Sequence, residues 1–286
     1  MDTMSLTAKY EDEMIAIRRH IHRHPELSNK EYKTTEFIRE KLTEYGVEIA
    51  EIGMKTKAYV MEQLRSFGIE PKDCGYGVTA TLGKGGKVLL LRADMDALPM
   101  KELTGLPFAS ENDGACHSCG HDIHTTVLLY CAKVLSEIRE ELAGTVMLIF
   151  QPADMGAGEL VDCNFTQVAK PDAFIGLHVS PEIDAGSIGL KKGPANASND
   201  FFNIKIKGKG GHGAHPENCI DPVVISGYVI TQLQTVISRE NYPVYPGVLT
   251  IGSIHGGTVN NIIPDYVEMH GTLRSLDPDC RKKMMA

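Results

Sequence analysis

The sequence lacks the long apolar run that a membrane-spanning helix requires. No stretch of its 286 residues approaches that length, and its first residues, MDTMSLTAKYEDEM, carry acidic side chains and no apolar core of signal-peptide length. We therefore expect a protein with no membrane segment that resides in the cytoplasm.

An excess of positive charge is also missing. The chain has 29 Lys and Arg against 37 Asp and Glu, which gives a formal net charge of -8 at pH 7. A net negative field does not attract nucleic acids or anionic membrane surfaces. Neither is an expected partner, and small molecules are favoured instead.

The cysteines do not form the pattern of a disulfide framework. They number seven and are scattered along the chain, which is typical of a reducing compartment. Cys116 and Cys119 form a CxxC pair, but a structural zinc site would require a second such pair, which the sequence does not contain. Reversible oxidation of this pair is an open alternative, although the Gly-His-Asp that follows is not needed by a redox motif.

The first part of the chain predicts an α/β domain. Residues 123–140 have apolar side chains at helical spacing and follow Asp122. Continuous apolar runs predict three buried strands, at residues 87–93, 145–151 and 173–179. The first two flank the helix, which predicts a strand, helix and parallel strand unit. We expect residues 1–187 to form one layered domain whose sheet is covered on both faces.

Residues 188–286 predict a second, α+β domain. Its helix spans roughly residues 222–238, with Asp221 as the N-cap and Pro222 in the first helical position. Strands are predicted at residues 201–208, 248–254 and 266–275. The helix has more apolar surface than one small sheet needs, so either core packing or a partner subunit covers it.

Two neighbouring segments near the amino terminus have similar sequences and predict the same helix twice. Residues 33–49, KTTEFIREKLTEYGVEI, resemble residues 55–71, KTKAYVMEQLRSFGIEP. A single tandem copy cannot build a solenoid, so an insertion or a join between related genes is the better interpretation.

Groups that bind metals gather where the predicted strands end. Asp94 and Asp96 follow the first strand, CHSCGHDIHT precedes the helix, QPADMG follows the second strand, and the third ends at His178. The carboxyl ends of such strands form the usual site of an open α/β sheet, and sulfur, imidazole and carboxylate together suit zinc or manganese. Taken singly, the two aspartates also fit strand-end turns, and His178 fits a hydrogen-bonded core histidine.

Seven motifs occur in a fixed order: RRHIHRHPELS, LRADMDALPMKELTGLPFAS, CHSCGHDIHT, FIGLHVSP, GKGGHGAHP, GGTVNNIIPD and GTLRSLD. With them the chain resembles the metal-dependent amidohydrolases of the hippurate hydrolase and N-acetyl-diaminopimelate deacetylase family, to which plant auxin-conjugate hydrolases and aminoacylases are related. The resemblance implies a zinc-exopeptidase-like three-layer α/β catalytic domain. It also implies an inserted α+β, ferredoxin-like domain that serves as a lid and dimerisation module.

The resemblance further implies a pair of divalent metal ions, zinc or manganese, in each subunit. Cys119, His121 and His178 correspond to ligands, whereas Cys116 lies outside the pattern. In the family a water between the metals attacks the amide carbonyl of an N-acyl amino acid, after a glutamate has taken its proton.

Residues of the second domain correspond to substrate-binding positions in the family. His212, Asn261 and Arg274 would bind the oxyanion and the substrate carboxylate, the first two across a homodimer. Read alone, His212 and Asn261 fit exposed turns, and Arg274 fits a surface charge.

The chain departs from the family at two places. Family members carry Glu-Glu after Gln-Pro-Ala, whereas this chain has Asp154, the expected catalytic base, followed by Met155. Aspartate is one methylene shorter than glutamate, and a neutral thioether does not replace a shared carboxylate. Relatives also continue beyond the final RKKMMA and supply a further histidine ligand there. The alternative hypothesis is therefore an impaired pseudoenzyme or truncated remnant that keeps the fold and part of the metal site.

Overall fold

The computed structural model of the chain describes residues 3–50, 77–153 and 171–286. The chain divides into two compact units, Met1–Glu182 and Ile183–Ala286. The second copy of the repeated helix, residues 55–71, lies outside the described residues, as do Asp154 and Met155. None of the helices in the described ranges combines the length and apolar character needed to cross a bilayer.

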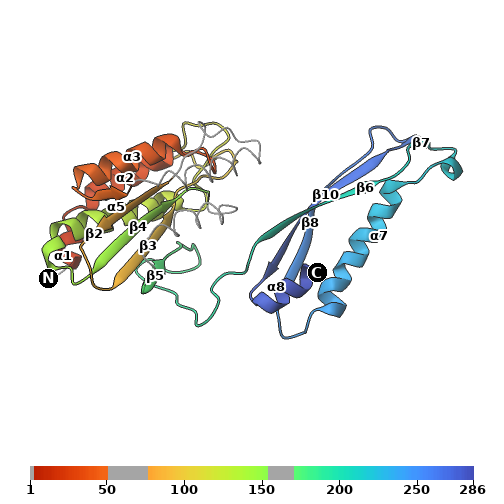
Figure 1. The fold of residues 1–286 in the computed structure, drawn as a ribbon. Helices are drawn as coiled ribbons and strands as arrows, with labels where there is room; N and C mark the ends of the chain where they lie inside the picture. Colours follow the sequence, from red (N-terminus) through yellow and green to blue (C-terminus); the bar gives the residue numbers. More distant parts are fainter. Residues whose placement is uncertain (1–2, 51–76, 154–170) are drawn as a thin grey trace. The chain divides into compact units, whose positions relative to one another are not determined.

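The first unit is a mixed sheet with helices packed on it (Figure 1). Its elements are α1 (Thr3–Ala8), α2 (Glu11–Arg23), α3 (Tyr32–Glu44), β1 (Glu48–Ala50), β2 (Val78–Leu82), β3 (Val88–Asp94), α5 (His121–Glu137), a 3-10 turn (Arg139–Glu141), β4 (Thr145–Gln151) and β5 (Ala173–Gly176). The strand order is β1-β2-β4-β3-β5. Strand β3 runs parallel to β4 and β5, whereas β2 is antiparallel to β4. The predicted strand, helix and parallel strand unit is confirmed as β3, α5 and β4.

Strand β4 lies at the centre of the sheet and is buried on both faces. All its residues from Val146 to Gln151 are buried. Leu148 joins the core beneath the helices, together with Ile38 and Leu129, while Met147 packs with Leu90 on the opposite face. Successive side chains of a strand point to opposite faces, so the continuous apolar run of β4 matches a strand covered on both sides.

Strand β5 differs from its prediction. It ends at Gly176, and Phe174 and Ile175 are each 54% exposed. Among the described residues β3 is its only neighbour, so β5 is an edge strand and not a buried one. His178 therefore lies in the loop after the strand and not at its end.

Helix α5 begins earlier than predicted, at His121. Gly120 precedes it in the left-handed conformation, with φ at 88°, and its carbonyl oxygen accepts a bond from the Ile123 N–H. His121, Asp122 and His124 consequently occupy the first turn of the helix. Because residues three apart share one face of a helix, His121 and His124 both project toward the strand ends.

The second unit contains a three-stranded antiparallel sheet. Its elements are β6 (Asp200–Lys207), β7 (Gly211–His212), a 3-10 turn (Pro216–Asn218), α7 (Pro222–Thr235), a π-helical turn (Val236–Glu240), β8 (Gly247–His255), β9 (Ile262–Ile263), β10 (Tyr266–Ser275) and α8 (Pro278–Met284). The strand order β6-β10-β8, with α7 linking β6 to β8, is the split βαβ arrangement of ferredoxin-like folds. A small core of Leu249, Leu273, Cys280 and Met284 holds the helices to the sheet.

Candidate metal centre

Three side chains that can bind a metal meet at the carboxyl ends of the strands of the first unit. Cys119 precedes α5, His121 is its first residue, and His178 follows β5. One ligand atom of each lies within 4.8 Å of the others. The Cys119 Sγ and His178 Nε2 atoms are 3.2 Å apart. A thiolate and two imidazoles at this separation fit a borderline divalent ion such as zinc.

Asp96 orients His121 within this cluster. The Nδ1 atom of His121 lies 2.9 Å from the Asp96 carbonyl oxygen and 3.0 Å from Asp96 Oδ1. The Ser28 hydroxyl in turn donates to Asp96 Oδ2 over 2.6 Å. A metal-binding histidine commonly directs its second nitrogen at a carboxylate or carbonyl, so Nε2 is the nitrogen of His121 suited to a metal.

Asp94 supports the other histidine of the same helical turn. His124 Nδ1 lies 2.6 Å from Asp94 Oδ1, and the Arg92 guanidinium donates to Asp94 Oδ2 over 2.7 Å. Burial alone would raise the pKa of Asp94, but the hydrogen bond from His124 and the nearby His121 and Arg92 outweigh it and lower the pKa to about 2. Asp94 is therefore a buried carboxylate, not a strand-end turn former.

The ring of His124 also reaches the loop that carries His178. The Val179 N–H donates to His124 Nε2 over 2.9 Å. Asp94, His121 and His124 also lie close enough together to be considered as a metal-binding group. Both ring nitrogens of His124 already serve Asp94 and Val179, however, so this trio is the poorer ligand set and His124 is a supporting residue.

The amino end of α5 is held from α2 through Asp122. Its Oδ2 atom lies 2.7 Å from His22 Nδ1 and 2.8 Å from Arg18 Nε. The side chain of Asp122 is fully buried, and a buried carboxylate requires such partners. The motif RRHIHRHPELS therefore positions the turn from which His121 projects.

The thiol of Cys116 is not part of the candidate ligand cluster of Cys119, His121 and His178. Cys116 and Cys119 are both free cysteines, and Cys116 is buried. Burial, followed by the nearby Glu102 and Asp122 charges, raises the pKa of Cys116. A redox-active thiol instead has a lowered pKa, so these surroundings do not favour the redox alternative.

Glu31 holds the chain just before the expected catalytic base. Its Oε1 atom accepts the Ala153 N–H over 2.8 Å, and Ala153 has a left-handed φ of 51°. Glu31 is fully buried, and burial together with the neighbouring Asp96 raises its pKa to about 8. The structure thus describes what precedes Asp154 but not Asp154 itself.

The predicted binding residues of the second unit lie in two places. His212 in β7 pairs with Ile262 in β9, and the Gly213 N–H donates to the Asn261 carbonyl over 2.8 Å, so His212 and Asn261 are neighbours. Arg274 lies near the far end of β10, eight residues beyond Tyr266. At a rise of about 3.3 Å per residue, Arg274 lies roughly 26 Å along the strand from Tyr266. Within this unit Arg274 is therefore remote from the other pair.

The sequence profile described as Peptidase family M20/M25/M40 matches residues 90–272. The chain belongs to this family. The match includes Cys119, His121 and His178 as well as His212 and Asn261 of the second unit, and it ends two residues before Arg274.

Among M20 relatives, an N-acetyl-L-cysteine deacetylase of Bacillus subtilis (strain 168) is 42% identical over 277 residues, which cover 96% of this chain and 62% of the relative. An N-acyl-L-amino acid amidohydrolase of Geobacillus stearothermophilus is 39% identical over 282 residues, covering 97% of this chain and 70% of that protein. The crystal structure of a dinuclear metal-binding M20 peptidase of Bacillus subtilis superposes with a TM-score of 0.70 at 37% identity, over 96% of this chain and 67% of that one. The chain thus spans less than two thirds of the deacetylase.

The sequence alone indicates no role for several residues that support the candidate ligand cluster or the segment before Asp154. Gly120, His124 and Val179 support the cluster, and Glu31 holds Ala153. One signal was available: His121 and His124 are three residues apart in a helix, which places both imidazoles on one face. The contact of His124 with Val179 depends on tertiary structure and has no such signal.

Proposed function

We propose that this M20 protein hydrolyses the amide bond of N-acyl amino acids with the help of divalent metal ions. The observation that carries the proposal is the approach of Cys119, His121 and His178 to within 4.8 Å at the strand ends. The names of two relatives, a deacetylase of N-acetyl-L-cysteine and an amidohydrolase of N-acyl-L-amino acids, support this substrate class.

Cys119, His121 and His178 would hold the metal. A thiolate with two imidazoles suits zinc, and manganese is the second candidate. The dinuclear centre named for the Bacillus subtilis peptidase supports two ions per subunit here. When bound, such ions lower the pKa of water and polarise the amide carbonyl.

The protein's own groups would supply proton transfer and orientation. Asp154 is the candidate general base, and Glu31 holds the Ala153 amide that directly precedes it. Asp96 fixes the orientation of His121 through Nδ1, which would leave the opposite nitrogen to bind the metal.

Residues of the second unit would bind the substrate. The imidazole of His212 and the amide of Asn261 can donate hydrogen bonds to an oxyanion, and the guanidinium of Arg274 suits a carboxylate. Arg274 lies far from the other two along the unit, which supports the proposal that His212 and Asn261 serve the site of a second subunit.

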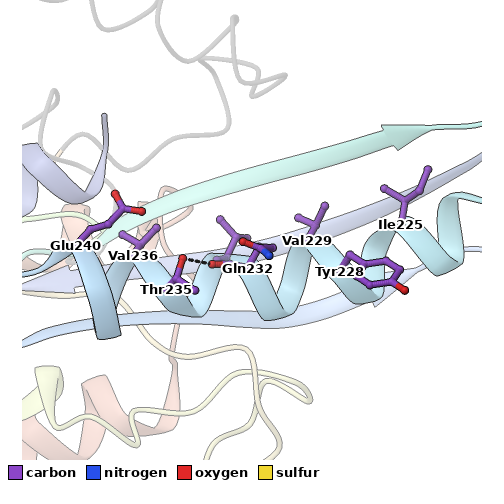
Figure 2. Close-up of a pocket in the computed structure, with 8 residues that line it drawn as sticks. Ile225, Tyr228, Val229, Gln232, Thr235, Val236 and Glu240 are labelled. Carbon is purple, nitrogen blue, oxygen red and sulfur yellow. Dashed lines mark hydrogen bonds between the residues drawn. The ribbon is translucent and has the colours of Figure 1, made fainter.

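The exposed side of α7 is the proposed homodimer interface. Only Pro222 and Ser226 of this helix are buried, while Val224 is 56% and Tyr228 is 69% exposed. Figure 2 shows Ile225, Val229 and Val236 projecting from one side of the helix, along a groove that they line. A largely apolar, exposed helix of this kind is best covered by a second copy of the chain.

Light scattering on the purified chain tests this interface. We expect a dimer that Val224→Lys and Tyr228→Lys convert to a monomer. The control is Leu103→Lys in the first unit, which replaces an 87% exposed side chain in the same way. We expect this variant to remain a dimer. A chain that is monomeric from the start, or a dimer that both α7 variants leave intact, would contradict the proposed interface.

Activity is tested with a panel of N-acetyl and N-benzoyl amino acids after adding zinc or manganese. The native chain is compared with the double variant Asp154→Glu, Met155→Glu, which restores the family's Glu-Glu. We expect metal-dependent hydrolysis by both, with the native chain at least about tenfold weaker because its carboxylate is displaced by about 1 Å.

Equal rates in the two proteins would contradict the predicted weakness. Hydrolysis by the double variant alone would favour the alternative of a remnant that keeps the fold and binds metal without turnover. Absence of hydrolysis by both would refute the proposed function.

A further inference from the structure

We propose that His124 is a positioning residue. By holding the Val179 amide it keeps the adjacent His178 beside Cys119, and it thereby sets the metal affinity of the ligand cluster. This inference rests on the metal site proposed above. It concerns a residue that does not itself bind the metal.

The hydrogen bonds of His124 determine its tautomer. The backbone N–H of Val179 can only donate, so the Nε2 atom that it approaches at 2.9 Å must be the unprotonated acceptor. The ring proton then lies on Nδ1, which donates to Asp94 Oδ1 over 2.6 Å. His124 thus links the end of β3 to the loop after β5 in one defined orientation.

The support behind this ring is rigid. His124 is 2% exposed and Asp94 is fully buried. Arg92 donates to the second oxygen of Asp94, and the Thr125 hydroxyl donates to its backbone carbonyl over 3.0 Å. Because both oxygens of the Asp94 carboxylate are bonded, it cannot shift without losing charge-assisted hydrogen bonds. The position of His124 Nε2 is therefore well determined.

A second contact brings the same loop against the turn that carries Cys119. A Cβ atom built on Gly120 would lie 2.4 Å from Val179 Cγ2, closer than any real contact. Val179 is therefore held on both sides, by a hydrogen bond from its backbone to His124 and by its side chain against Gly120. Since His178 is the adjacent residue, these contacts decide how its ring meets the Cys119 thiol at 3.2 Å.

Two substitutions separate the two bonds of His124. The amide nitrogen of asparagine falls near Nδ1, so His124→Asn keeps the bond to Asp94 and loses the bond to Val179. The side-chain oxygen of glutamine falls near Nε2, so His124→Gln keeps the bond to Val179 and leaves Asp94 Oδ1 without its donor. The pair is matched in chemistry and differs in which bond survives.

The zinc dissociation constant is measured by competition with a chromophoric chelator, on the full chain. We expect His124→Asn to weaken zinc binding roughly 10- to 100-fold, the usual effect of removing an outer partner of a metal ligand. His124→Gln should keep most of the affinity. Unfolding of the metal-free proteins in urea should give the opposite order, because glutamine leaves a buried carboxylate short of a donor.

Cobalt substitution provides a spectroscopic readout. The thiolate-to-cobalt charge-transfer band of His124→Gln should match that of the wild type, and that of His124→Asn should be weaker or shifted. Equal affinities in the two variants, or affinities that simply follow their stabilities, would overturn the inference. A loss of one bound metal in both variants would show that His124 is a ligand and would also overturn it. If the wild-type chain binds no metal, the proposed site itself fails.

Discussion

The Nε2 atom of His178 lies 3.2 Å from the Sγ atom of Cys119, although 59 positions separate the two residues in the chain. Strands β3 and β5 are parallel neighbours, so the loop after β5 and the turn that opens α5 emerge at the same end of the sheet. His124 and Gly120 then hold that loop against the turn. The sheet brings the two segments near each other, and these two local contacts set the final distance between the two candidate ligands.

Cys119→Ser is expected to weaken zinc binding by at least about tenfold, because a hydroxyl is a poorer ligand for zinc than a thiolate. Cys116→Ser is the matched control, since that thiol is buried outside the ligand cluster. Chelator competition and the count of bound zinc per chain check both variants. Equal losses from the two substitutions would contradict the assignment of Cys119.

Gly120→Ala is expected to lower both stability and zinc affinity. An L residue in the left-handed region costs about 1–2 kcal/mol, and the new methyl group would also meet Val179 Cγ2 at 2.4 Å. The control is Gly114→Ala, because Gly114 has a similar φ of 92° and no atom within 4 Å of the position that the alanine methyl group would occupy. Only Gly120→Ala should change zinc affinity, and adding Val179→Ala should restore part of it. If both alanine variants lowered the zinc affinity equally, the contact of residue 120 with Val179 would be shown to be unimportant for zinc binding.

The Glu31 carboxyl is expected to make the protein less stable as the pH rises. Its pKa is raised from 4.5 to about 8, so the folded chain holds a proton that the unfolded chain releases between these values. Its contribution to stability is fully present below pH 4.5 and is lost as the pH rises through about 8, with a slope of up to about 1.4 kcal/mol per pH unit.

Glu31→Gln removes this titration and keeps an oxygen for the Ala153 N–H. Urea unfolding of the metal-free proteins at several pH values should show a growing advantage of the variant between pH 5 and 8. A constant difference between the two proteins across that range would mean that Glu31 does not titrate as inferred.

Asp221→Ala is expected to destabilise the second unit by about 1 kcal/mol, the usual cost of losing an N-cap. Asp221 Oδ1 accepts the N–H groups of Val223 and Val224, over 2.8 and 3.3 Å. Asp221→Asn retains an oxygen acceptor and should lose much less. Thermal unfolding of both variants tests this, and an asparagine variant as unstable as the alanine variant would argue against the capping bond.

Local patterns in the sequence were sufficient to predict several elements. The apolar runs at residues 87–93 and 145–151 correspond to β3 and β4, and the Asp-Pro pair at residues 221–222 marks the start of α7. These features arise from side-chain spacing and capping, which act between residues close together in the chain. Strand β5 was predicted as buried from the same kind of pattern and is exposed, because burial depends on which segments cover a strand.

The sequence by itself determined the ligand types, since thiol, imidazole and carboxylate chemistry is present in the motifs regardless of how the chain folds. Only the tertiary structure decided how these groups are supported. The bond between the Val179 amide and His124 joins residues 55 positions apart, and it involves a backbone group that every residue type except proline possesses. Because such a bond leaves no trace in residue identity, the positioning role of His124 depended on the spatial arrangement of β3, α5 and the loop after β5.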